Sequence, residues 1–96
     1  MRKSARPGCP VELTLDRLAG KWKTILLARL KSGPQRYADL RASVPGLSDK
    51  VLTDRLHELR ADGLVDQDPQ GRYHLSPEGE TLRPVLQALY DWGQQH

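Results

Sequence analysis

The spacing of apolar residues in the first third of the chain predicts two helices in succession. Val11 to Leu18 has helical spacing, Pro10 suits the first helical position, and Gly20 ends the segment. The segment Trp22 to Leu30 repeats this spacing until Ser32-Gly33-Pro34 stops it. We expect the second helix to bury one face, made of Trp22, Ile25, Leu26 and Leu30.

The middle of the chain predicts a short helix, a tight turn and a longer helix. The short helix covers about Tyr37 to Ser43, the turn lies at Pro45-Gly46-Leu47, and the longer helix runs from Ser48 to Asp62. Serine is a favourable N-cap, so Ser48 marks the start of the longer helix. The residues expected to be buried in this unit are Leu40, Val44, Leu52, Leu56 and Leu59, the last three at i, i+4 and i+7.

Beyond Asp62-Gly63 the pattern predicts a short β-hairpin. Two strands, Leu64 to Asp68 and Arg72 to Leu75, are joined by the turn residues Pro69-Gln70-Gly71. Upstream, Gln35 and Arg36 have the character of a short edge strand.

The last twenty residues predict a helix that begins with strong signals and is then interrupted. Ser76 is the expected N-cap, and Pro77 occupies the first helical position. Because Pro84 lies inside the same apolar run, we expect a kink there or two consecutive helices. The apolar stripe of this region consists of Leu82, Val85, Leu86, Leu89 and Trp92.

Helix, turn, helix and hairpin in this order are the arrangement of a winged helix-turn-helix, whose second helix lies in the DNA major groove. The predicted fold class is therefore mainly α with a small β-hairpin wing. We expect one domain over residues 9–96, preceded by a flexible basic arm at 1–8. Within it the helix-turn-helix covers about 37–62, the wing about 64–75, and a C-terminal dimerisation helix about 77–95.

The distribution of charge adds to this picture. The formal net charge is +3, but residues 1 to 36 carry nine Lys/Arg against two Asp/Glu, while residues 37 to 96 carry six against ten. Such asymmetry suits either a surface for a polyanion or an ordinary solvated face, and the helix-turn-helix pattern favours nucleic acid. No apolar run of membrane-spanning length and no signal peptide are present, so we expect a cytoplasmic protein.

The exposed face of the longer middle helix supplies the candidate DNA-reading residues. A recognition helix contacts base edges mainly from its N-terminal half, which here offers Ser48, Lys50, Thr53 and His57. Arg36 and Arg72 are the phosphate candidates outside that helix, and the alternative for each is a solvated arginine.

Other charged residues allow two interpretations. Asp49 and Asp54 could accept a hydrogen bond from a cytosine amine, or act as helix-dipole partners or solvated charges, which we favour. The bases Arg17, Lys21 and Lys23 could contact phosphate or lie near Cys9 and serve it instead.

An ordered set of short motifs extends over about residues 9 to 96. The motifs are Cys9-Pro10-Val11-Glu12, Thr14-Leu15, Gly20-Lys21-Trp22-Lys23, Ile25-Leu26, Arg36-Tyr37-Ala38-Asp39-Leu40, Gly46 to Thr53, Leu56-His57-Glu58-Leu59, Asp62-Gly63-Leu64-Val65, Tyr73-His74-Leu75-Ser76 with Gly79, and Pro84-Val85-Leu86 to Trp92-Gly93. This set resembles the HxlR-type winged-helix regulators of bacteria. The resemblance implies a homodimer on a palindromic double-stranded DNA operator, and in some members an N-terminal cysteine, here Cys9, that senses oxidants or electrophiles.

Two features depart from the family pattern. The wing turn is short, and its first strand carries Asp66 and Asp68 where the family tends to have a basic residue. These acids weaken the case for strong wing contacts with DNA and leave Arg72 as the main wing candidate.

Cys9 is the single cysteine of the chain, so any disulfide must join it to a second subunit or a small thiol. Its place before a helix start, near basic residues, favours a thiolate that can be oxidised. The alternative is a small apolar residue that packs an interface. No cofactor and no metal site are expected, because Cys9 and the three histidines are too scattered for a zinc pattern.

A chain of 96 residues without an internal disulfide often needs a partner subunit. We expect a homodimer formed through the first and last helices, with Leu15, Leu82, Val85, Leu86, Leu89 and Trp92 at its interface. Three rivals stay open: a winged-helix module that binds protein, a DNA-binding regulator with a structural cysteine and an unknown small-molecule effector, and a thiol enzyme built on Cys9. The last lacks a base close to the thiol in sequence and any acyl- or phosphoryl-transfer motif, so we expect no enzyme.

Overall fold

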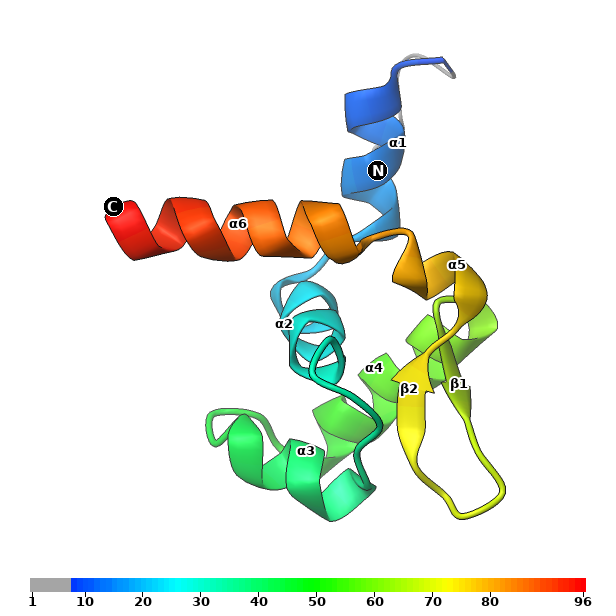
Figure 1. Cartoon of the computed structure of the whole chain (residues 1–96). Helices are drawn as coiled ribbons and strands as arrows, with labels where there is room; N and C mark the ends of the chain where they lie inside the picture. Colours follow the sequence, from blue (N-terminus) through cyan, green and yellow to red (C-terminus); the bar gives the residue numbers. More distant parts are fainter. Residues whose placement is uncertain (1–7) are drawn as a thin grey trace.

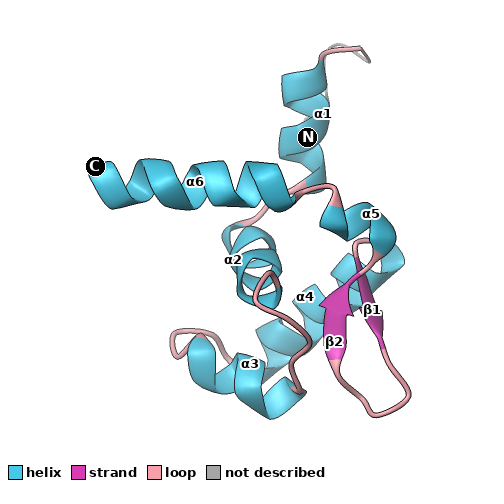
Figure 2. Ribbon diagram, in the orientation of Figure 1, coloured by secondary structure: helices cyan, strands magenta, loops and turns pink. Residues whose placement is uncertain are grey.

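The computed structural model describes residues 8–96, and most of the predicted basic arm, residues 1–7, lies outside the described residues. The fold is mainly helical with one antiparallel hairpin, the winged helix-turn-helix predicted from the sequence (Figures 1 and 2). Within residues 8–96 no helix is long and apolar enough to cross a membrane. In chain order the elements are α1 (Pro10–Arg17), α2 (Lys21–Leu30), α3 (Tyr37–Ser43), α4 (Asp49–Ala61), β1 (Val65–Gln67), β2 (Tyr73–Leu75), α5 (Pro77–Glu80) and α6 (Arg83–Gln95).

The core is built from leucines of α2 and α4, which pack against each other at the centre of the molecule. The predicted stripe on α4 is confirmed, because Leu52, Leu56 and Leu59 are all buried. On α2, Leu26 and Leu30 are buried and Trp22 and Ile25 are partly buried against the same core, so the predicted face is confirmed. Leu27 is buried as well, because α2 contacts α3, α4, α6 and β2 and its buried arc is wider than one helical stripe.

The turn between α3 and α4 is held by short-range hydrogen bonds and one buried side chain. The N–H of Leu47 donates to the carbonyl of Val44 at 3.1 Å, and the Leu47 side chain is buried. Ser48 caps α4 as predicted, since its hydroxyl oxygen accepts the N–H of Val51 at 3.2 Å. The two helices therefore meet through a turn that leaves the first residues of α4 exposed.

The hairpin pairs Val65 with Leu75, Asp66 with His74 and Gln67 with Tyr73, so both strands are shorter than predicted. Asp68 closes the turn, because its carboxylate accepts the backbone N–H groups of Gln70 at 3.0 Å and Arg72 at 2.9 Å. The predicted edge strand at 35–36 is reduced to one antiparallel bridge, between Gln35 and Tyr73. This bridge covers the β2 edge and leaves β1 as the outer strand.

The C-terminal region consists of two consecutive helices, as the position of Pro84 predicted. Pro84 lies in the first turn of α6, where a missing N–H costs no helical hydrogen bond. Ser76 caps α5 by accepting the N–H of Gly79 at 2.9 Å, and its own hydroxyl donates to the Gly63 carbonyl at 2.6 Å. Both α1 and α6 extend away from the remainder of the domain (Figure 1).

The contact between α5 and the hairpin leaves no room for a side chain at Gly79. A Cβ atom at this position would lie 2.1 Å from the carbonyl oxygen of Leu64, which is backbone and cannot move aside cheaply. We predict that Gly79→Ala lowers the free energy of unfolding by ~1–3 kcal/mol, the usual cost of overpacking. Urea denaturation followed by circular dichroism measures the change.

Gly93 supplies the matched control for this substitution. It also lies in a helix, but nothing is within 4 Å of a Cβ atom built there. Because alanine is favoured over glycine inside helices, Gly93→Ala should keep or raise the stability. Equal stability of the Gly79→Ala variant and the wild type would show that α5 does not pack against the Leu64 carbonyl in this way.

Candidate nucleic-acid interface

Helix α4 turns one side toward solvent, and this side carries the predicted reading residues. Ser48, Lys50, Thr53 and His57 are all exposed, because the leucines that alternate with them are directed into the core. α3 and the hairpin lie on either side of α4, away from α1 (Figure 1). We call the following exposed or partly exposed polar side chains of these elements the α4 surface: Arg36, Arg41, Ser48, Lys50, Thr53, His57, Arg60 and Arg72.

An ion pair joins α3 to the first turn of α4. The Arg41 Nε donates to Asp49 Oδ1 at 2.7 Å, and the Tyr37 hydroxyl lies 3.2 Å from the same oxygen. The hydrogen bond from Arg41, followed by its positive charge, lowers the pKa of Asp49 below its ordinary value. Asp49 is therefore an ion-pair partner of Arg41 rather than only a solvated charge. Arg41 was not among the residues predicted from the sequence, because its role depends on how α3 approaches α4.

The predicted phosphate candidates Arg36 and Arg72 each contact a residue of the wing turn. Arg36 Nη1 donates to the Gln70 carbonyl at 2.9 Å, and Arg72 Nε donates to Asp68 Oδ2 at 2.8 Å. The pKa of Asp68 is lowered, first by the backbone N–H of Arg72 and then by its guanidinium. Both arginines thus have structural partners and remain exposed at the tip of the hairpin.

A small hollow of about 110 Å³ lies between α4 and the wing. Thr53 and His57 line it from α4, and Tyr73 lines it from β2. Arg60 completes this side of the hollow and donates to Gln67 Oε1 at 3.0 Å. Arg60 and Tyr73 were not singled out from the sequence, since only the packing of the hairpin against α4 brings them there.

The bases Arg17, Lys21 and Lys23, for which the sequence left phosphate contact or a role beside Cys9 open, have partners within the chain. Lys23 Nζ is 3.7 Å from Glu58 and 3.5 Å from Asp62, both near the C-terminal end of α4. These two carboxylates hold its ammonium group. The ammonium of Lys21 lies over the Trp22 ring, 4.8 Å from its centre.

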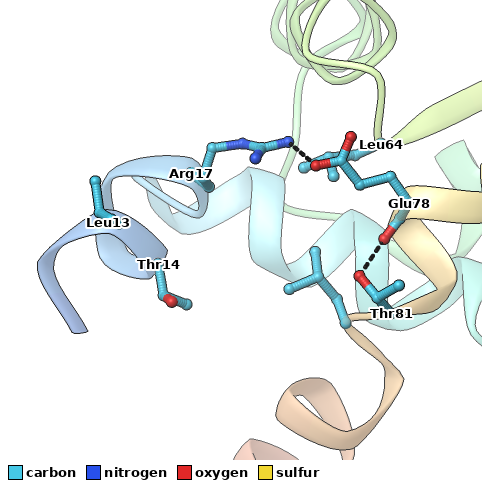
Figure 3. A pocket seen from close by; sticks show the side chains of 7 residues that line it. Leu13, Thr14, Arg17, Leu64, Glu78 and Thr81 are labelled. Atoms are coloured by element: carbon cyan, nitrogen blue, oxygen red, sulfur yellow. Dashed lines mark hydrogen bonds and ion pairs between the residues drawn. The ribbon is translucent and has the colours of Figure 1, made fainter. Parts of the chain in front are cut away.

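Arg17 crosses a shallow cleft of about 200 Å³ between the base of α1 and α5 (Figure 3). Its guanidinium is 3.0 Å from the Glu78 carboxylate and 3.3 Å from the Asp62 carbonyl oxygen. Leu13 and Thr14 line the α1 side of the cleft, on the same side as Arg17. A polar bridge across an open cleft, rather than a packed core, thus joins α1 to the end of α4.

Two helices present apolar side chains to solvent. α1 buries none of its residues, and Val11 and Leu15 are 67% and 62% exposed. On α6, Leu89 and Trp92 are 53% and 66% exposed, as an interface would require. Leu13 on α1 and Tyr90 on α6 belong to the same exposed set, although sequence analysis did not include them.

The other predicted interface residues pack within the chain. Leu86 is only 1% exposed and belongs to the core, so it has almost no surface to give to a partner. Leu82 and Val85 are partly buried against the same core. These residues are inward because the first turns of α6 rest on α2, whereas its later turns extend beyond it.

Cys9 is the N-cap residue of α1 and is partly buried. Its carbonyl oxygen accepts the N–H of Leu13 at 3.0 Å, while its side chain makes no capping hydrogen bond. The start of α1, where Cys9 is the N-cap, lies at the far end of that helix from α3 and the hairpin (Figure 1).

Comparison with known protein families gives a match over most of the chain. The family model described as HxlR-like helix-turn-helix matches residues 17–96. Among curated proteins, the uncharacterized HTH-type transcriptional regulator YdeP of Bacillus subtilis (strain 168) is 40% identical over 95 residues, covering 93% of this chain and 74% of YdeP.

Solved structures of related regulators superpose closely. The redox regulator HypR in its oxidized form is 36% identical, with a TM-score of 0.79, covering 92% of this chain and 97% of HypR. The quinone-bound YodB of B. subtilis is 29% identical, with a TM-score of 0.79, covering 92% of this chain and 100% of YodB. The similarity thus extends from α1 to α6.

The ion pair between Arg41 and Asp49 generates a testable pH dependence. We predict that Arg41→Gln raises the pKa of Asp49 toward its ordinary value of 3.8, as seen by carboxyl ¹³C NMR titration. Because the folded-state pKa is lowered, the pair stabilises the wild type above that ordinary value and loses its effect as pH falls through the lowered pKa. The wild-type advantage over Arg41→Gln should therefore vanish in acid; an unshifted Asp49 titration would mean that the pair does not form in solution.

Proposed function

The chain belongs to the HxlR-like helix-turn-helix family of transcriptional regulators, and we propose that it binds a palindromic DNA operator as a homodimer switched by modification of Cys9. The observation that carries the DNA-binding part is the exposed side of α4. Lys50, Thr53 and His57 project there from a helix whose opposite face is fixed in the core. A helix held in this way can enter the major groove and keep its orientation.

The α4 side chains suit the chemistry of base edges and phosphates. Lys50 can donate to guanine acceptors, Thr53 can hydrogen-bond a base or touch a thymine methyl group, and His57 lies one turn further along. Ser48 is the N-cap at the start of α4, where backbone N–H groups favour a phosphate. Arg36 and Arg72, held at the wing turn, lie where the hairpin would approach the DNA backbone.

The exposed apolar faces of α1 and α6 support the homodimer. An isolated helix as short as α1 is marginal in water, so its Val11 and Leu15 need a partner surface. Leu89 and Trp92 on α6 offer one, and a two-fold axis would let each subunit give the same patch. Two α4 helices about 34 Å apart would then enter successive major grooves.

Cys9 is the proposed switch, in keeping with the descriptions of HypR as a redox regulator and of YodB as quinone-bound. In a disulfide reaction, Cys9 and a second thiol each lose one proton and one electron as the S–S bond forms. An oxidant such as diamide takes up the two protons and the two electrons. The second thiol is Cys9 of the other subunit or a small thiol, because the chain has no other cysteine.

The Arg17 bridge supports a route from Cys9 to the α4 surface. α1 carries Cys9 at its start and Arg17 at its end, and Arg17 contacts Glu78 on α5 and the Asp62 carbonyl beyond α4. Because little packing restrains α1, a covalent change at Cys9 would reorient it at small cost. A coupling of only about 1–3 kcal/mol, on the order of 5- to 150-fold in affinity, suffices for a switch.

One rival has specific support: the carboxylates of Asp49, Asp54 and the wing, which pair with cations of the α4 surface, suit a winged-helix module that binds a protein. Such binding should weaken little as salt rises, whereas DNA binding falls steeply. A third possibility is a DNA-binding regulator in which Cys9 is structural and an unknown small molecule is the effector. The salt and oxidant responses below separate the three.

We predict specific, salt-sensitive binding to the DNA upstream of the chain's own gene in a mobility-shift assay. Lys50→Ala should weaken this binding; a slope of log affinity against log salt that falls by about 1 would assign Lys50 to phosphate, and an unchanged slope would assign it to a base edge. Unchanged affinity would remove Lys50 from the interface. Absence of specific binding by the wild type would favour the protein-interaction module.

We further predict that diamide changes operator affinity in the wild type and not in Cys9→Ser. The reduced Cys9→Ser variant should bind like the reduced wild type, because serine retains the N-cap position without the redox chemistry. An oxidant response that persists in Cys9→Ser would contradict sensing by this thiol. Binding that ignores diamide in both proteins would leave Cys9 as a structural residue.

The dimer is tested by Leu89→Arg, which places a charge in the exposed apolar face of α6. We expect monomers by light scattering, because a buried unpaired charge opposes association strongly. Gln87→Glu is the matched charge control, since two residues along a helix turn the side chain by about 200° onto the opposite face, and a carboxylate there can still accept the hydrogen bond from Lys31. A stable Leu89→Arg dimer would place the interface elsewhere.

A further inference from the structure

Each lysine and arginine between residues 36 and 75 already has a partner within the chain. Four of them pair with carboxylates, and Arg36 and Arg60 donate to amide oxygens of Gln70 and Gln67. The carboxylate pairs are Arg41 with Asp49 at 2.7 Å, Lys50 with Asp54 at 3.0 Å, Arg55 with Glu58 at 2.5 Å and Arg72 with Asp68 at 2.8 Å.

The same segment carries six Lys/Arg and seven Asp/Glu. A DNA-binding surface usually has an excess of positive charge, because phosphate attraction supplies most of the affinity that does not depend on sequence. Three of the pairs, those of Asp49, Asp54 and Asp68, lie where α4 and the wing would approach the DNA. Their carboxylates oppose the approach of phosphates of any sequence.

We propose that Asp49, Asp54 and Asp68 are specificity-determining residues that suppress sequence-independent binding to DNA phosphates. This proposal rests on the proposed DNA-binding function and adds a selection mechanism to it. Nonspecific DNA offers only phosphates, so a cation must leave its carboxylate for a phosphate while the carboxylate remains nearby and repels it. An operator adds hydrogen bonds to base edges, which offset that repulsion.

The paired cations can still contact DNA. Side chains of Lys50 and Asp54 are 83% and 44% exposed, so their pair is weak and opens at little cost. Arg41 is bound through Nε, which leaves the outer guanidinium nitrogens available to a second acceptor. Each carboxylate therefore reduces the net charge without removing the donor.

Asparagine substitutions separate charge from geometry. The Asn Oδ1 atom can still accept the hydrogen bonds that Asp49 receives from Arg41 and Tyr37. At position 68 the same atom can accept the backbone N–H groups of Gln70 and Arg72, which hold the wing turn. The triple variant Asp49→Asn, Asp54→Asn, Asp68→Asn thus changes charge and largely keeps the hydrogen bonds.

The test is the affinity of the dimer for a random-sequence duplex, measured by fluorescence anisotropy between about 50 and 200 mM salt. We expect roughly fivefold tighter binding for each carboxylate removed, which corresponds to ~1 kcal/mol between unit charges about 4 Å apart in water. The triple variant should therefore bind nonspecific DNA on the order of 100-fold tighter at low salt and show a steeper salt dependence. Its preference for operator over random duplex should fall.

Glu80→Gln is the matched control, because Glu80 also pairs with an arginine, Arg83, but at the α5–α6 junction. It removes the same charge and should leave the salt slope nearly unchanged. Circular dichroism checks that the triple variant is folded. Should it unfold, Asp54→Asn alone still tests the proposal, since within residues 8–96 the Asp54 side chain bonds to the exposed Lys50 and holds no other element.

Unchanged nonspecific affinity in a folded triple variant, or an equal gain in Glu80→Gln, would overturn the proposal. Failure of the DNA-binding function has a different signature. In that case the wild type prefers no sequence from a random pool, and the triple variant gains only nonspecific affinity. Selection from a random pool thus reports on operator recognition, and the affinity of the variants for a random-sequence duplex reports on charge.

Discussion

The structure depends on one requirement, that α4 bury a leucine face and expose the opposite one. A helix of this length is marginal in water by itself, so Leu52, Leu56 and Leu59 must pack to keep it folded. Their packing against α2 fixes the rotation of α4 about its axis, and with it the direction in which Lys50, Thr53 and His57 point. The packing of the core therefore sets the positions of the side chains on the exposed side of α4.

Ion pairs hold both ends of α4 against neighbouring helices. At the N-terminal end, Asp49 pairs with Arg41 of α3; at the C-terminal end, Glu58 and Asp62 pair with Lys23 of α2. Asp49 matches the helix dipole, whereas Glu58 and Asp62 lie near the end where the dipole disfavours negative charge, so Lys23 offsets them there. Different elements therefore restrain the two ends.

Local signals allowed much of this fold to be predicted from the sequence. Ser48, Ser76 and Pro84 act within a few residues of their positions, so their effects could be recognised without the structure. The interior position of Leu86 and the pairing of Lys23 could not, because each depends on a helix that is distant in sequence. The same limit explains why the two arginines at the wing turn were recognised as candidates while their partners were not.

The hairpin has a consequence for how molecules of this protein meet one another. Gln35 covers the β2 side, but β1 is an outer strand whose backbone groups could pair with a strand of another molecule. Outer strands of this kind invite aggregation unless charge or shortness prevents it. β1 has three residues and carries Asp66 at its centre, with Asp68 just beyond its end. Asp66 and Asp68 thus place negative charge along this edge, where it opposes strand pairing between two copies of the chain.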